Sequence, residues 1–217
     1  MIWLFSDIFA TFFLGSFVSL ITIINPPSAI PLFTSLSADL DDAESEKLAR
    51  RGAMYAFAIL TVSLFAGSLI LSTFGISYGA LRIAGGIVVA LLGHEMLFRR
   101  EQRRGDPTVE QPHNPAFFPL ALPGISGPGT IAVVIGISTE IQELGGWGGV
   151  AIASAGTVAA MALTCLLSWL TLRSARQISN RLGRSGIEAM TRLMGFLLIC
   201  IGVQFIASGI RTFVSGI

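Results

Sequence analysis

Two short segments place prolines beside polar residues or glycines within long apolar stretches. The first is residues 24–33, Ile-Asn-Pro-Pro-Ser-Ala-Ile-Pro-Leu-Phe, and the second is residues 123–129, Pro-Gly-Ile-Ser-Gly-Pro-Gly. A proline has no backbone N–H, so a helix that contains it leaves a carbonyl free four residues earlier. At membrane depth, such groups are tolerated where protein or a water-filled cavity supplies the missing hydrogen bonds. Each segment is therefore a candidate binding site at the break of a helix.

The second segment can bind an anionic group through its backbone. Pro128 is placed to begin a half-helix, with Ser126 or Gly127 as the cap. The unpaired N–H groups of that half-helix, beginning with those of Gly129 and Thr130, are expected to face a cavity. Together with the positive end of the helix dipole, they can hold a carboxylate without an arginine.

The first segment offers a complementary set of groups. Asn25 followed by Pro26 is typical of an N-cap and a first helical residue, so a half-helix is expected to begin here too. The Asn25 side chain, the amides of Ser28 and Ala29, and the carbonyls freed by prolines such as Pro31 include acceptors that suit an ammonium or a cation. Two such breaks facing each other suit a small zwitterion. The alternative is that these residues only kink packed helices, which is common in membrane proteins.

The composition predicts an all-α polytopic membrane protein. Of the 217 residues, 53% are hydrophobic and 12% are charged, and the mean hydropathy is +0.75. The formal net charge of +1 provides no basic surface for nucleic acid. Six apolar stretches are long enough to cross the bilayer. The predicted spans are residues 8–36, 52–74, 78–98, 116–138, 147–171 and 187–213.

The positive charges predict the orientation of the chain. Eleven of the 14 Lys and Arg residues fall in the connections that follow the first, third and fifth spans. By the positive-inside rule these connections are cytoplasmic, so both termini are expected outside. The residues concerned are Lys47, Arg50, Arg51, Arg99, Arg100, Arg103, Arg104, Arg173, Arg176, Arg181 and Arg184.

The chain contains an internal repeat of three spans. A polar segment at 101–115, with Gly, Pro and both signs of charge, predicts a cytoplasmic linker between a first repeat at 1–100 and a second at 116–217. An odd number of spans in each half requires the copies to have opposite orientations. Inverted repeats with matching broken helices, here the first and fourth, are typical of transporters. The matching residues are Pro26 with Pro123, Pro31 with Pro128, Arg82 with Arg192, Gly85 with Gly195, and His94 with Gln204.

The two breaks also resemble the signature segments of a known family. Residues 25–33 together with residues 119–129, which include Pro119-Leu-Ala-Leu-Pro123 and Ser126-Gly-Pro-Gly129, are similar to those of the MarC family of six-span bacterial membrane proteins. The resemblance extends over essentially the whole chain. It implies a location in the bacterial inner membrane and, through the SnatA-type members, transport of small neutral amino acids such as glycine or alanine.

Few ionisable residues lie within the predicted spans, and such residues are candidates for function. Arg82, His94 and Glu95 could serve in coupling or gating; the alternative is interfacial anchoring, with Glu95 paired to Arg99 four residues later. The predicted spans show no nucleophile with a base, carboxylate pair or metal-ligand group, so we expect neither an enzyme nor a cofactor. Coupling to H+ or Na+ and the oligomeric state stay open, and a membrane scaffold or a channel is the alternative to a transporter.

Overall fold

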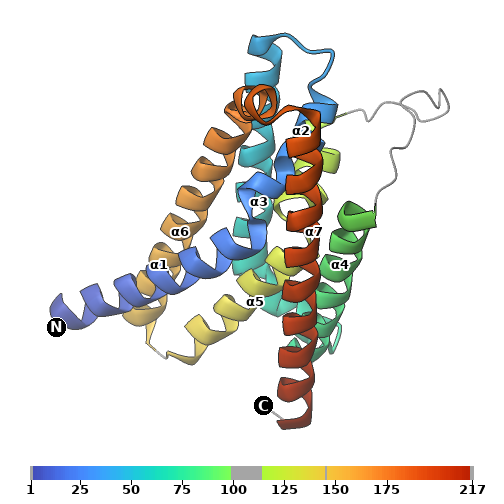
Figure 1. The fold of residues 1–217 in the computed structure, drawn as a ribbon. Coiled ribbons are helices and arrows are strands. Elements are labelled where there is room, and N and C mark those ends of the chain that lie inside the picture. The colour runs from blue at the N-terminus through green and yellow to red at the C-terminus, as the bar shows by residue number, and fades with distance from the viewer. Residues whose placement is uncertain (1, 99–113, 145, 216–217) are drawn as a thin grey trace.

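The computed structural model describes residues 2–98, 114–144 and 146–215, and every regular element within these ranges is a helix (Figure 1). The elements in chain order are α1 (Ile2–Ile24), the 3-10 turn η1 (Pro26–Ala29), α2 (Ile30–Leu36), α3 (Asp42–Thr73), α4 (Tyr78–Phe98), the irregular π-type segment η2 (Ala116–Ile125), α5 (Pro128–Glu143), α6 (Trp147–Arg173) and α7 (Ala175–Ser215). Most of the predicted linker, residues 101–113, lies outside the described residues.

The helices have the length and the surface of membrane spans. Within the described residues, five are long and apolar enough to cross a bilayer, and η2 with α5, bent by 64°, is a sixth candidate when the pair is counted as one broken span. Large apolar side chains such as Leu14, Phe65 and Leu69 are more than half exposed, as residues facing lipid would be. These observations confirm the prediction of an all-α polytopic membrane protein. Five spans are Ser6–Leu36, Asp42–Thr73, Tyr78–Phe98, Trp147–Arg173 and Ser185–Val214.

Helix α3 begins well before the predicted second span because its first turns are stabilised by a cap. Asp41 accepts a hydrogen bond from the backbone N–H of Glu44 at 2.7 Å, and the backbone N–H of Asp41 donates to the Glu44 carboxylate at 3.3 Å. This reciprocal capping box starts the helix in a polar segment. Lys47, Arg50 and Arg51 therefore lie on α3 itself and not in a loop.

The first break differs in detail from the prediction. Pro26 does occupy the first position of η1, but Asn25 has a left-handed backbone with φ 43° and ψ 69° and its side chain caps nothing. Its amide Nδ2 instead contacts the Met194 sulfur on α7 at 3.0 Å. Asn25 thus occupies the predicted N-cap position before Pro26, but its side chain makes no capping hydrogen bond and contacts α7 instead. The short turn η1 then leads into α2.

The second break begins its half-helix as predicted. Gly127 is the N-cap of α5 and Pro128 occupies its first turn. Before this point η2 is interrupted at Phe118 and Leu122, whose backbones are extended. Each of these residues precedes a proline, which disfavours the helical conformation in the residue before it. The sequence therefore breaks the fourth span at several successive positions.

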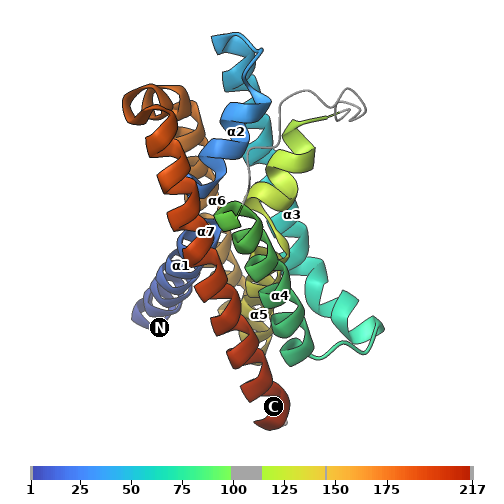
Figure 2. The same cartoon turned by 45° about the vertical axis from the view of Figure 1, so that its right-hand side comes forward.

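Helices α4 and α7 form a closely packed antiparallel pair (Figure 2). Glycines recur every seven residues along the contact line of each helix, and each faces a glycine of the other. A Cβ atom added to any of them would lie 2.5–3.0 Å from the facing backbone oxygen. The absence of side chains thus allows the two backbones to touch, as small residues do in membrane helix pairs. The facing pairs are Gly79 with Gly209, Gly86 with Gly202, and Gly93 with Gly195.

The two ends of the molecule differ. Both termini and the α3–α4 and α5–α6 connections lie at one end, which is the lower end in Figure 1. At the other end, Arg176 near the start of α7 binds the Asp42 carboxylate and the backbone oxygens of Ser37 and Leu40. This arginine ties the α2–α3 connection to the α6–α7 corner. We call the end of the molecule that contains these Arg176 contacts the latched end.

Candidate functional site

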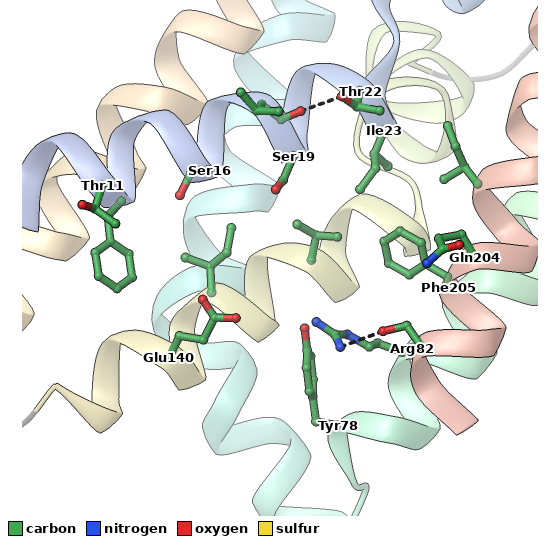
Figure 3. Close-up of a pocket in the computed structure, with 17 residues that line it drawn as sticks. Thr11, Ser16, Ser19, Thr22, Ile23, Tyr78, Arg82, Glu140, Gln204 and Phe205 are labelled. Atoms are coloured by element: carbon green, nitrogen blue, oxygen red, sulfur yellow. Dashed lines mark hydrogen bonds between the residues drawn. The ribbon is translucent and has the colours of Figure 1, made fainter. Parts of the chain in front are cut away.

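A cavity of ≈ 560 Å³ lies between α1, α4, α5 and α7 (Figure 3). It draws residues from both halves of the chain and combines apolar walls with hydroxyl, amide and charged side chains. Its size falls within the range of small-molecule sites in proteins. The polar residues that line it are Thr11, Ser16, Ser19 and Thr22 of α1, Tyr78 and Arg82 of α4, Glu140 of α5, and Gln204 and Ser208 of α7.

The wall contributed by α1 follows from helix periodicity. Thr11, Ser19 and Thr22 recur at helical spacing along one face of an otherwise apolar helix. The Ser16 hydroxyl is buried and shares a hydrogen bond with the hydroxyl of Thr157 at 3.2 Å. Ser19 is exposed and points into the cavity in Figure 3. The first helix therefore presents small polar side chains to the cavity and leaves its volume open.

Arg82 is held in a defined position on the α4 wall. Its Nη1 donates to the Ser208 hydroxyl at 3.0 Å, and its guanidinium carbon lies 4.3 Å from the centre of the Tyr78 ring. A cation over an aromatic face is favourable. Tyr78 itself fits closely over Gly136, where an added Cβ would fall 1.7 Å from the phenol oxygen. Gly136 thus makes room for the ring that supports the arginine.

Glu140 lines the cavity but was absent from the predicted site. The predicted fourth span ended at residue 138, whereas α5 continues to Glu143. Glu140 follows Val133 and Ile137 at helical spacing, and both of these residues also line the cavity. A longer predicted helix would have placed its carboxylate on this face.

The second break is packed and does not line the cavity in this conformation. The fully buried Ser126 hydroxyl donates to the Ala121 oxygen at 2.8 Å, and the Thr130 hydroxyl contacts the Ile125 oxygen at 3.5 Å. An added Cβ at Gly129 would meet Val89 of α4 at 2.3 Å. The expectation that Gly129 and its neighbours border a cavity therefore differs from the structure, because α4 fills that space. Gly127 and Pro128 also lie outside the lining.

The first break lies just beyond the cavity. Ile23 of α1 still lines it, while the predicted site residues that follow do not. The turn η1 contacts η2, and an added Cβ at Gly124 would lie 3.1 Å from Leu32. The structure thus brings the two breaks into contact with each other. The predicted residues of the first break are Asn25, Pro26, Ser28, Ala29 and Pro31, of which Pro26 and Ala29 are buried.

Of the three candidates for coupling or gating, only Arg82 borders the cavity. His94 and Glu95 are exposed near the other end of α4, where the His94 ring lies 4.7 Å from that of Phe98. Gln204, the residue equivalent to His94 in the predicted repeat, does line the cavity. A coupling role for His94 and Glu95 stays a prediction.

Comparison with known proteins agrees with the family resemblance seen in the sequence. The family model described as MarC family integral membrane protein matches residues 10–214. Relatives named UPF0056 inner membrane protein MarC, from Salmonella paratyphi A and Salmonella typhimurium, are 39% identical over 213 residues, which is 94% of this chain and 96% of each relative. The protein of the same name from Escherichia coli O139:H28 is 38% identical with the same coverage. No solved structure matches the chain. The chain therefore belongs to the MarC family of integral membrane proteins.

Proposed function

We propose that this protein is a secondary transporter that moves small neutral amino acids across the bacterial inner membrane by alternating access. The observation that carries the proposal is the ≈ 560 Å³ cavity, in which both halves of the chain place polar side chains between apolar walls. A water-filled polar cavity at membrane depth beside broken helices is the usual setting of a transporter site. The relatives named as inner membrane proteins support the location.

The proposed architecture is a pair of inverted three-span repeats. In support of it, the third helix of each half packs against the other through reciprocal glycine contacts, and the breaks of the first and fourth spans contact each other. An axis in the membrane plane relates such elements in inverted repeats. Residues 25–31 and 126–130 are then proposed to border the cavity when the latched end opens and the opposite end closes.

The orientation is proposed from the basic residues, of which Arg173 and Arg176 lie at the latched end. A reporter fused after Ile217 should report the outside, and one inserted at Gly105 should report the cytoplasm. Alkaline phosphatase and green fluorescent protein fusions measure these two locations. The reverse pair of results would refute the orientation, and a shared side for both sites would refute the count of six spans.

The substrate class is tested with purified protein in liposomes. Labelled alanine should accumulate by counterflow, and unlabelled glycine, alanine or serine should compete for it. Lysine and glutamate should compete at least about tenfold more weakly, because a third charge would have to leave water without a partner. Liposomes without protein are the control. Transport of lysine in preference to alanine would contradict the proposal.

A further inference from the structure

Two opposite charges face the cavity from the two halves of the chain. Arg82 extends from the second turn of α4 and Glu140 from the last turn of α5, and both line the cavity. Figure 3 shows both side chains pointing into it, with the Tyr78 hydroxyl between them. Tyr78 lies close enough to interact electrostatically with each charge. A cation and an anion thus face a shared space.

Neither charge is neutralised by an ion pair in the described part of the chain. The ion pairs found there join Arg173 to Glu46, Arg176 to Asp42 and Arg192 to Glu188. The Arg82 guanidinium carries five N–H donors, and its partners in the described residues are the Ser208 hydroxyl and Tyr78, both of them uncharged groups. An arginine within a membrane-spanning helix such as α4 normally pairs with an anion or serves a function, because its charge is costly in the bilayer. The cavity is where such an anion can reach Arg82.

We propose that Arg82 and Glu140 hold the two ends of the amino acid, with the carboxylate on Arg82 and the ammonium directed to Glu140; this inference rests on the proposed function. The planar guanidinium matches the geometry of a carboxylate and binds it through paired hydrogen bonds. A carboxylate such as that of Glu140 accepts hydrogen bonds from an ammonium. Recognition of charge in this cavity therefore comes from these two side chains.

The arrangement selects for molecules that carry both charges. A ligand without an ammonium leaves Glu140 unmatched, and a ligand without a carboxylate leaves Arg82 unmatched. A ligand that lacks one of the two charges loses a charge-assisted hydrogen bond and should bind more weakly.

The first arm of the test uses the unaltered full-length protein in liposomes. Alanine, propionate and ethylamine are compared as inhibitors of labelled alanine uptake. Propionate and ethylamine should each need about a tenfold or greater concentration to inhibit by half. Inhibition by either of them at the concentration effective for alanine would overturn the assignment of both ends.

The second arm compares Arg82→Gln and Glu140→Gln with matched controls on equivalent or neighbouring positions. Arg192→Gln is the control in the second half, where Arg192 pairs with Glu188 at 2.6 Å, and Glu143→Gln is the control on α5. Both cavity variants should raise the alanine concentration for half-maximal uptake about tenfold or more. The controls should leave it unchanged.

The ligand series separates recognition from a merely structural role. In Arg82→Gln, alanine should lose its advantage over ethylamine, so that the two inhibit at similar concentrations. In Glu140→Gln, alanine should likewise inhibit no better than propionate. A structural role would weaken all ligands alike. If the unaltered protein transports alanine and both variants bind alanine with unchanged affinity, the assignment of Arg82 and Glu140 fails and the proposed function stands. If the unaltered protein transports no alanine, the assignment and the proposed function both fail.

Discussion

Replacing Gly86 by Ala should destabilise the folded protein by about 1–3 kcal/mol, the range that overpacking of a tight contact costs. The added methyl group would lie 2.6 Å from the Gly202 oxygen and 2.9 Å from the Ile206 nitrogen. Both contacts are backbone atoms, so no side chain can rotate away and α4 must separate from α7. The measurement is the midpoint of thermal unfolding of the purified protein in detergent, which should fall by several degrees.

The matched control is Gly15→Ala on α1. A Cβ at Gly15 meets nothing within 4 Å, and alanine is the better helix former. This variant should keep or slightly raise the unfolding midpoint. Equal midpoints for Gly86→Ala and Gly15→Ala would show that α4 and α7 do not pack through their glycines.

Replacing Ser19 by Trp should abolish transport and leave the protein folded. Ser19 is exposed and points into the cavity, so the indole fills space that the proposed substrate requires. We expect labelled alanine uptake into liposomes to fall at least about tenfold. The control is Leu14→Trp on the same helix, since Leu14 is 57% exposed and does not line the cavity. Equal uptake by the two variants would mean that the substrate does not pass through this cavity.

The membrane architecture could be predicted from the sequence because each of its causes is local. Apolar stretches of this length form helices in a bilayer, since a helix satisfies all of its backbone groups within the segment. The prolines before Gly129 fix the start of α5, because a proline fits only in the first turn of a helix. The conformation of Asn25 could not be predicted in the same way. Its left-handed turn depends on contacts with α7 that are distant in the sequence.

The cavity could not be predicted because it depends on how four helices pack. Proline and glycine mark where a helix breaks, but they do not show whether the space beside the break is a cavity or is filled by another helix. The space beside Gly129 is filled by Val89 of α4. The charge of Arg82 could be found in the sequence, whereas its position opposite Glu140 requires the tertiary structure. The hydroxyl residues of α1 lie outside the predicted site, although their helical spacing on one face indicates a polar stripe along this helix.

The most direct test of the central claim is protection of a cysteine in the cavity by substrate. Ser19→Cys is made in a protein in which Cys165 and Cys200 are replaced by Ala, and a water-soluble maleimide is added with or without alanine. Glu143→Cys in the same background, at an exposed position of α5 outside the cavity, is the control. The proposal predicts that Ser19→Cys reacts from water and that alanine slows its reaction, while leaving the rate at Glu143→Cys unchanged. A Ser19→Cys thiol that reacts at the same rate with saturating alanine, or that never reacts from water, would contradict the claim that this cavity is the substrate site.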